Sequence, residues 1–344
     1  RRLRIVRTQT GDSGVRHGFR PAWLARLEQR VAAFARVVVW GHPLHSHTHS
    51  YVHQGFARAF RALGVPTIWT DDVHALGAID LADTLFLTEG QVAAGMPLRA
   101  DCHYVLHNVA RATYAPVADR VLLLQVAGTE PDDRARDGSV ERVDAYTYSE
   151  QGRNGPAVLF QPWATDLLPA EFDFGVPLPP RLSQRRLTTL ARRLAGRAPQ
   201  AVWVGTIGDG KFGNAGELAP FRTACREAGV PFVHRAGVDR AVHMDLVRRS
   251  FVAPAIVGRW QLENGYIPCR IFKNISYGRP GLTNSPWVEA AFDSEVLCRA
   301  DTAELFWAST RVVPSRRALR TQMLEVRERH TYLSRIATIL EHLP

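Results

Sequence analysis

The first half of the chain alternates between short apolar runs and segments with helical spacing, and this alternation constrains the fold most strongly. Residues 36–40 (RVVVW) form an apolar run that ends at Gly41, as expected of a buried parallel strand. Residues 49–63 then carry apolar side chains at helical spacing, and Gly64 stops that helix before a second run, residues 65–69. Strands joined through helices in this order predict a doubly wound α/β domain.

The same pattern continues and then starts again after a break. Further strands are expected at residues 84–87, 103–106, 120–125, 146–149 and 157–160. Residues 161–180 are rich in proline and lack periodicity, which is typical of a linker, and an arginine-rich helix is expected at residues 183–195. A second α/β unit is then predicted from the strand at Ala201, with helices at residues 218–228, 242–249 and 268–277 and a strand at 231–234. One long helix, from Ser315 to Leu340, is expected to close the chain.

The length of the chain agrees with this division. Its 344 residues are too many for one ordinary core and sufficient for two domains. We therefore predict an N-terminal domain over residues 1–165, a linker over 166–198 and a C-terminal domain over 199–314. The helix within residues 315–344 is expected to pack back on the N-terminal domain.

The composition narrows the functional classes. A hydrophobic fraction of 46% and a charged fraction of 22% are those of a globular protein, no apolar stretch approaches 18 residues, and no signal-peptide pattern is present, although the chain does not begin with Met. Four scattered cysteines without a CxxC pair suit a reducing compartment, so a cytoplasmic location is expected, with peripheral attachment at the inner membrane face as the alternative. The net charge of +10 favours phosphorylated or polyanionic partners. Only two of the 43 basic residues are lysines, Lys211 and Lys273, and both fall in the segments described next.

The segment richest in chemical signals covers residues 261–285 (QLENGYIPCRIFKNISYGRPGLTNS). A proline stands at the expected first turn of a helix, and Gly278 ends that helix. The N-terminus of a helix offers unpaired N–H groups and the positive end of a dipole, both of which favour phosphate. Arg270 in the first turn adds donors for the same phosphate, and Glu263 before the helix could accept hydrogen bonds from sugar hydroxyls. The alternative is an ordinary capped surface helix.

This segment resembles the donor-binding region of GT-B glycosyltransferases, and LEN…YIPCRIF is similar to the FEN…YITEKLW pattern of α-1,3-fucosyltransferases. The resemblance covers about a dozen residues. It implies that Glu263, Asn264 and Tyr266 meet the nucleotide sugar and that Arg270 takes the place of a lysine at the donor diphosphate. Two departures are the short spacing between Asn264 and Tyr266 and the replacement of the family's second Glu by Cys269. Retaining enzymes of this fold usually carry two glutamates eight residues apart here; because Gly265 and Lys273 stand at those places, an inverting enzyme is predicted.

A second motif, residues 203–214 (WVGTIGDGKFGN), follows the first strand of the second unit. Its four glycines let the backbone approach a phosphate closely, and Lys211 adds a point charge. The sequence matches neither a Walker A motif nor GxGxxG. Alone it is typical of a flexible loop, but the resemblance places a loop at this position beside the donor diphosphate.

The third motif, residues 41–53 (GHPLHSHTHSYVH), contains five histidines after the first strand. Histidine titrates near neutrality and could remove a proton from an acceptor hydroxyl. Zinc is the alternative, since His45, His47 and His49 alternate and His53 lies one helical turn after His49, but neither an acidic nor a cysteine ligand stands nearby in the sequence. The third interpretation is that these histidines are ordinary polar loop residues or helix caps.

Two acidic positions follow other strands of the first half. The pair Asp71-Asp72 and the pair Glu89-Gly90 come directly after predicted strands. Each carboxylate could line the acceptor side or cap a helix, and for Asp71-Asp72 we favour the cap.

These motifs predict two Rossmann-like domains facing across a cleft, with the acceptor bound by the first and a nucleotide sugar by the second. The predicted reaction moves a sugar from a nucleotide-sugar donor to an acceptor hydroxyl, with inversion and without a metal or other cofactor, and a GDP-sugar is slightly favoured over a UDP-sugar. The candidate catalytic residues are His45, His47 and His49, and the candidate donor-binding residues are Gly205, Thr206, Lys211, Asn214, Glu263, Asn264, Tyr266, Arg270 and Lys273.

Two alternatives to this reaction stay open. The first is a glycosyltransferase that modifies nucleic acid or polysaccharide, because the net positive charge suits an anionic acceptor. The second is a non-catalytic protein of the same fold that binds a sugar nucleotide or a glycan.

Overall fold

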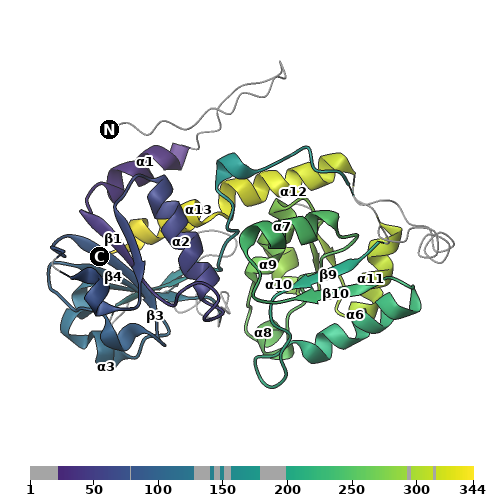
Figure 1. Ribbon diagram of the computed structural model, residues 1–344, viewed down its shortest axis with the longest axis horizontal. Helices are drawn as coiled ribbons and strands as arrows, with labels where there is room; N and C mark the ends of the chain where they lie inside the picture. The colour runs from purple at the N-terminus through teal and green to yellow at the C-terminus, as the bar shows by residue number, and fades with distance from the viewer. Residues whose placement is uncertain are drawn as a thin grey trace, which may run out of the picture. The chain divides into compact units, whose positions relative to one another are not determined.

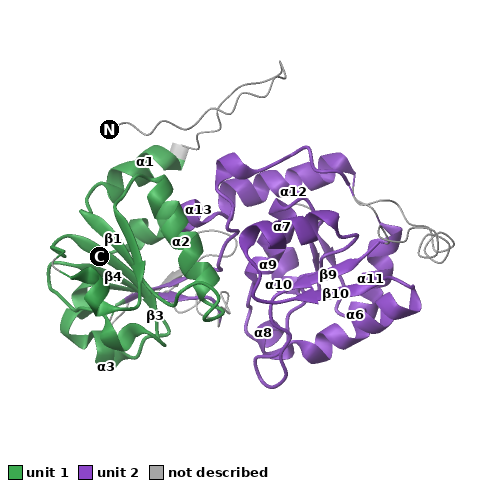
Figure 2. Ribbon diagram, viewed as in Figure 1, with its two compact units in different colours: residues 1–123, 154–156, 336–344 green, residues 124–153, 157–335 purple. Residues whose placement is uncertain are grey.

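A computed structural model of the protein describes residues 22–77, 79–127, 140–142, 148–150, 156–178, 199–292, 296–312 and 315–344. Contacts within the chain divide it into two compact units (Figure 2). Unit 1 comprises Arg1–Leu123, Asn154–Pro156 and Ile336–Pro344; unit 2 comprises Leu124–Arg153 and Ala157–Arg335. Both units mix helices with parallel strands, so the α/β fold class predicted from the sequence is confirmed.

Unit 1 is built on a parallel sheet (Figure 1). Its strands lie in the order β2-β1-β3-β4-β5 and cover β1 (Arg36–Trp40), β2 (Thr67–Thr70), β3 (Thr84–Glu89), β4 (His103–His107) and β5 (Val121–Gln125). The described helices of this unit are α1 (Ala22–Val31), α2 (Ser50–Ala62), α3 (Arg111–Tyr114) and the part of α13 (Tyr332–His342) from Ile336 on, with short 3-10 turns at Val73–Leu76, Ala93–Gly95 and Ala115–Arg120.

Strands β1 and β3 each have a neighbouring strand on both sides, and their residues are buried accordingly. Every residue of β3 is buried, as are four of the five residues of β1. Such strands need helices or loops on both faces, which is what the continuous apolar runs indicate. The register places Trp40 opposite Thr88 and Glu89 opposite His107, so the carboxyl ends of β1, β3 and β4 meet at one edge of the sheet.

Unit 2 contains two small parallel pairs. β9 (Ala201–Val204) pairs with β10 (Phe232–Arg235), and β11 (Leu282–Thr283) pairs with β12 (Leu297–Cys298). The helices around them are α6 (Ala215–Glu227), α7 (Arg240–Arg249), α8 (Arg259–Glu263), α9 (Cys269–Ser276), α10 (Pro286–Ala291), α11 (Thr302–Arg311) and α12 (Arg316–Arg329). Earlier in the chain, β7 (Tyr148–Glu150) pairs antiparallel with β6 (Val140–Arg142) and with β8 (Ala157–Phe160), and a 3-10 turn covers Pro169–Glu171.

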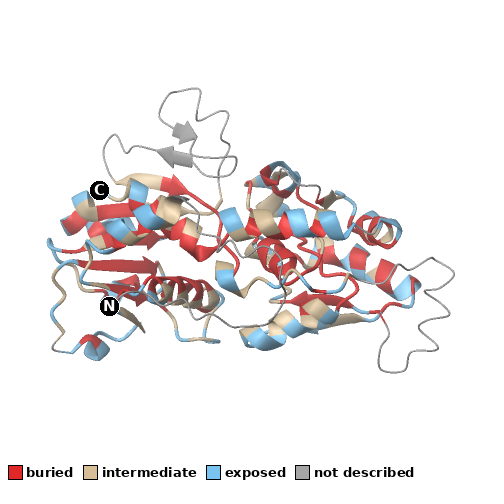
Figure 3. Cartoon of the chain, turned by 90° about the horizontal axis from the view of Figure 1, so that it is seen from above, coloured by how far each residue is buried: buried red, intermediate tan, exposed pale blue. Residues whose placement is uncertain are grey.

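The core of unit 2 forms where its helices meet the strand pairs. Trp203 of β9, Phe221 of α6 and Phe306 of α11 are fully buried, and the rings of Phe221 and Phe306 meet edge to face at 5.5 Å. Figure 3 shows the buried strands enclosed by helices whose outer faces are exposed. These contacts fix the strand–loop connections that carry the candidate site residues of this unit.

The single long helix predicted at the end of the chain is wrong. The structure has two helices there, α12 and α13 (Tyr332–His342), separated at His330 and Thr331. The Thr331 Oγ1 accepts from the Ser334 N–H, and the ring of His330 stacks on Phe272 at 4.2 Å. The helical periodicity hides this break because neither glycine nor proline marks it; His330 stacks in a tertiary contact where the first helix ends, and Thr331 caps the start of the second.

The proline-rich segment after β8 is also more structured than a linker of its composition suggests. Residues 161–167 are buried, and the carboxylate of Asp166 accepts a 2.5 Å hydrogen bond from the Tyr277 hydroxyl. The helix expected at residues 183–195 lies outside the described residues. The predicted domain boundaries remain predictions.

Candidate active site

The first candidate site lies at the carboxyl edge of the unit 1 sheet. β1 leads into the histidine-rich loop, while Glu89 ends β3 and His107 ends β4. Because these strands are parallel neighbours, the loop histidines meet a carboxylate from another strand, far away in the sequence. Ligands of open α/β sheets bind at this edge of the strands.

Glu89 is the anionic centre of this cluster. Its side chain is only 4% exposed, and its Oε1 lies 3.2 Å from the His42 Nε2. Its Oε2 lies 4.0 Å from the His49 Nδ1 and accepts from the Gln91 N–H at 3.3 Å. The sequence-based interpretation that no acidic ligand accompanies the histidines is therefore wrong, because strand pairing supplies one.

The imidazoles pack against one another around this carboxylate. The ring centroids of His42 and His47 are 4.4 Å apart, those of His47 and His49 are 5.3 Å apart, and those of His49 and His107 are 5.7 Å apart. Burial, followed by the charges of His47 and His42, lowers the pKa of His49 to about 4. The His49 imidazole is therefore neutral at neutral pH.

His53 completes the cluster from helix α2. It is 2% exposed, and burial lowers its pKa to about 3. A Cβ atom at Gly41 would overlap the His53 ring, so glycine at that position is what lets the ring come this close to the strand end. Gly41 therefore serves the packing of the site as well as the end of β1.

His45 is the one proposed catalytic histidine that points elsewhere. It is exposed, its φ is +70°, and its Nδ1 lies 2.8 Å from the Tyr51 hydroxyl. His47 and His49 do join the cluster. At the end of the neighbouring strand, Asp72 accepts from the His74 N–H and caps the 3-10 turn, in agreement with the cap predicted for it.

The second candidate site lies at the carboxyl ends of β9 and β10 in unit 2. The Arg270 guanidinium lies over the ring of Trp203 at 3.7 Å and donates from Nε to the Val204 carbonyl at 3.1 Å. Gly205 has a φ of +122°, and a Cβ there would lie 2.6 Å from the Arg270 Nη2. The glycine is therefore required by both its backbone angle and the close approach of the guanidinium.

Arg270 brings a positive charge without a carboxylate to balance it. Among the described residues no Asp or Glu lies within 4.0 Å of its guanidinium nitrogens, and burial lowers its pKa. The Gly205 carbonyl, on the same loop, also lies 2.8 Å from the His234 Nε2. A half-buried, unbalanced guanidinium beside a glycine turn favours a bound anion.

The remaining loop residues divide into structural and exposed positions. The Asn214 Oδ1 accepts from the Gly208 N–H and closes the loop, while Thr206 is exposed and its carbonyl accepts from the Trp203 indole. Lys211 is exposed, with its Nζ 5.4 Å from the Phe212 ring. Only Gly205 of these predicted donor residues is placed directly against Arg270.

The residues of the Glu-Asn pair belong to helix α8 and its end. The exposed carboxylate of Glu263 forms a 2.8 Å ion pair with Arg259, and the Asn264 side chain donates to the Trp260 carbonyl. Burial raises the pKa of Tyr266, which lies close enough to Arg270 for their charges to interact. Within the described part of the chain, no contact joins Glu263 to Arg270.

Lys273 lies one turn after Arg270 but is only 7% exposed. Its charge helps to hold the pKa of the buried Asp166 below its ordinary value against the opposing effect of burial. It also lowers the pKa of His243, second to burial, to about 3. In this structure Lys273 therefore balances a buried carboxylate.

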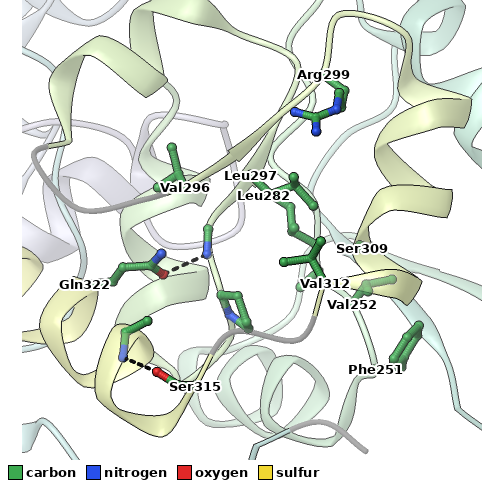
Figure 4. Close-up of a pocket in the computed structure, with 14 residues that line it drawn as sticks. Phe251, Val252, Leu282, Val296, Leu297, Arg299, Ser309, Val312, Ser315 and Gln322 are labelled. Carbon is green, nitrogen blue, oxygen red and sulfur yellow. Dashed lines mark hydrogen bonds between the residues drawn. The ribbon is translucent and has the colours of Figure 1, made fainter. Parts of the chain in front are cut away.

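A separate cavity of about 400 Å³ lies at the opposite ends of the unit 2 strands (Figure 4). Its walls include Val252, which pairs with the first residue of β9, and Leu282, which begins β11. Gln322 accepts from the Gly281 N–H at its margin. Because ligands of parallel sheets bind at the carboxyl ends of strands, the Arg270 site is a stronger candidate for a ligand site than this apolar cavity.

Comparisons with known proteins leave the activity to be argued from these sites. No protein-family model and no curated protein sequence matches the chain. Among solved structures, the chain is similar to a trehalose-6-phosphate synthase, OtsA, with a TM-score of 0.46 and 11% identity over 86% of this chain and 76% of that one. It is also similar to an alpha,alpha-trehalose-phosphate synthase (UDP-forming) from Burkholderia vietnamiensis, with a TM-score of 0.43 and 14% identity. That match covers 86% of this chain and 80% of the other one. Neither is a fucosyltransferase, and similarity this loose supports no residue role.

In the described part of the chain, none of the helices is long and apolar enough to cross a membrane.

The sequence alone did not identify His42 as the partner of Glu89, and it left Glu89 as a cap or acceptor residue. The usable signal was their common position after neighbouring strands, since parallel strands bring their carboxyl ends together.

Proposed function

We propose that this protein is a glycosyltransferase that moves a sugar from a nucleotide-sugar donor to an acceptor hydroxyl. The observation that carries the proposal is the Arg270 guanidinium, held against Gly205 by Trp203 and lacking a carboxylate partner among the described residues. A planar fork of donors in this setting suits a diphosphate, and the first turn of α9 adds backbone N–H groups and the helix dipole. The donor would bind to unit 2.

The acceptor half of the reaction is assigned to unit 1. The His42 imidazole, 20% exposed, could accept the proton of an acceptor hydroxyl as that oxygen attacks the anomeric carbon. Glu89 behind it would orient the ring and stabilise the imidazolium that forms, as a carboxylate does behind a general base. His47 and His49 stay candidates for the same role, whereas the position of His45 gives it no contact with the carboxylate.

Departure of the nucleoside diphosphate is the other chemical step. As the bond to the sugar breaks, negative charge grows on the diphosphate, and Arg270 and the helix terminus would stabilise it without a metal. We retain an inverting, metal-independent reaction as part of the proposal, so chelators should leave transfer intact. The sugar, the base and the acceptor are not assigned; a GDP-sugar remains slightly favoured over a UDP-sugar.

The test of this function starts from nucleotide binding. GDP, UDP, CDP and dTDP are added in turn, and the melting temperature is measured, because a ligand of the native state raises stability. The stabilising nucleotide is then supplied as its labelled sugar donors, and release of the sugar to water or to hydroxyl acceptors is followed. If no nucleoside diphosphate stabilises the protein, the proposal is wrong; binding without transfer or hydrolysis would indicate a non-catalytic sugar-nucleotide-binding protein.

A further inference from the structure

The cluster at the carboxyl edge of the unit 1 sheet has the composition of a metal site. His42, His47 and Glu89 each offer one ligand atom, and these three atoms all lie within 4.8 Å of one another. The two histidines lie in the loop after β1, and Glu89 ends β3. These two strands are paired neighbours, so the sheet holds both parts of the site in place. A site anchored on strands is positioned more firmly than one carried only by loops.

We propose that His42, His47 and Glu89 bind a divalent transition-metal cation of the zinc class. Two imidazole nitrogens and one carboxylate oxygen form a ligand set that suits zinc and its neighbours, whereas calcium and magnesium prefer oxygen ligands alone. Metal–ligand bonds of about 2.0–2.2 Å separate tetrahedral ligands by roughly 3.4 Å. The 3.2 Å between the His42 Nε2 and the Glu89 Oε1 is already close to that separation.

The buried atoms of this cluster support the assignment independently. The His42 Nε2 and the Glu89 Oε1 are both buried, and neither has a hydrogen-bond partner. Within the described ranges, no Lys or Arg forms an ion pair with Glu89, which is 3% exposed. A buried carboxylate oxygen without a hydrogen-bond donor is costly, and a cation between Oε1 and the His42 Nε2 would satisfy both atoms.

The cluster also leaves a fourth coordination position. His49 lies beside His47 at 5.3 Å between ring centroids, with its Nδ1 4.0 Å from the Glu89 Oε2. Its backbone N–H reaches the His47 Nδ1 at 3.2 Å, the long end of the hydrogen-bond range, so a metal at that nitrogen would displace only a weak contact. A water, a substrate hydroxyl or His49 would complete a tetrahedral site.

The proposed metal and the proposed reaction would compete. This step rests on the proposed function, in which the His42 lone pair accepts the proton of the acceptor. A cation at the His42 Nε2 would replace the proton through which Glu89 orients the ring and stabilises the imidazolium, so zinc would slow transfer and a chelator would restore it. The metal would thus regulate the site and not take part in the chemistry.

The experiment uses the full chain, stripped of metal with a chelator, and Co²⁺ as a visible probe. Equilibrium dialysis measures the stoichiometry and the dissociation constant. The position and intensity of the ligand-field absorption bands of Co²⁺ report its coordination number. We expect one Co²⁺ per chain, displaced by Zn²⁺ but not by Mg²⁺, with the absorption of a four- or five-coordinate ion. His47→Ala and Glu89→Gln should each weaken binding by more than about tenfold, since removing even an outer partner of a ligand costs roughly 10- to 100-fold.

His45→Ala is the matched control, because this histidine lies in the same loop and outside the cluster. It should bind Co²⁺ like the unaltered protein, and circular dichroism should show all three variants folded. Absence of binding, or equal binding by the unaltered protein, His47→Ala and Glu89→Gln, would overturn the metal site. Both readouts are independent of the donor, so they distinguish failure of the metal site from failure of the glycosyltransferase assignment.

Discussion

The two candidate sites occupy equivalent places in their units and have opposite electrostatic character. The unit 1 site surrounds one buried carboxylate, Glu89, with imidazoles, whereas the unit 2 site holds one guanidinium, Arg270, without a carboxylate among the described residues. Both lie at the carboxyl ends of parallel strands. The same edge of an α/β sheet thus gives one site suited to a proton or a cation and another suited to an anion, and the loop residues decide which.

Removing the proton acceptor of unit 1 should give the largest effect. We expect His42→Ala to lower kcat by about 10²- to 10⁴-fold, the usual contribution of general base catalysis, and to leave nucleotide affinity unchanged. Transfer kinetics and isothermal titration of the nucleotide measure the two quantities separately. His74→Ala, at an exposed histidine of the same unit, is the control. A His42→Ala enzyme with full kcat would remove the assigned role of unit 1.

Removing the charge of unit 2 should instead act on the donor. A charge-assisted contact is worth about 1.5–3 kcal/mol, so Arg270→Ala should weaken nucleotide binding roughly ten- to a hundredfold and lower turnover as well. Arg270→Lys should recover only part of the affinity, because a point charge lacks the planar fork.

The stacking of Arg270 on Trp203 adds a control to that experiment. Because the alanine variant also loses this packing, its melting temperature must be measured beside its affinity. Unchanged nucleotide affinity in a folded Arg270→Ala protein contradicts the donor site.

Acid should destabilise unit 2 through a histidine outside its donor loop. Burial, followed by the charge of Lys273, lowers the pKa of His243 to about 3. Its unfolded form has a pKa near 6.5, so the unfolded chain binds the extra proton and stability is lost as the pH falls below about 6.5. At pH 5 this amounts to about 2 kcal/mol, since each pH unit is worth about 1.4 kcal/mol.

Chemical unfolding at pH 7.5 and pH 5.0 measures that loss. His243→Phe keeps a ring against Tyr277, which His243 meets edge to face at 5.2 Å, and removes the titrating group, so its stability should depend less on pH. His74→Ala should leave the pH dependence as it was. An identical pH dependence in His243→Phe would mean that other groups carry the acid sensitivity.

The smallest predicted effect is the difference between alanine substitutions at two glycines of the unit 2 loop. Gly205 and Gly210 both have positive φ, but only at Gly205 would a Cβ meet the Arg270 guanidinium. Gly210→Ala should cost about 1 kcal/mol of stability, the backbone cost alone, with nucleotide affinity unchanged. Gly205→Ala should also weaken nucleotide binding, by less than Arg270→Ala does. Equal nucleotide affinities for the two glycine variants would show that the Gly205–Arg270 contact does not matter for the ligand.

The sequence alone determined the first strands and helices of unit 1. The apolar run at residues 36–40 became β1 with the same bounds, and the helical spacing after it became α2, because burial on both faces and a one-sided apolar stripe leave local signatures. It also singled out the histidine-rich loop and Arg270, since their residue types are unusual in one short segment.

Only the tertiary structure decided which of these residues meet. Strand pairing brought Glu89 to His42, and packing on Trp203 placed Arg270 against Gly205, while Lys273, three residues later, was buried beside Asp166. The break between α12 and α13 likewise depends on His330 stacking on Phe272. Local spacing fixes which face of a helix or strand is apolar, but contacts between residues tens of positions apart depend on register and packing, which no local pattern contains.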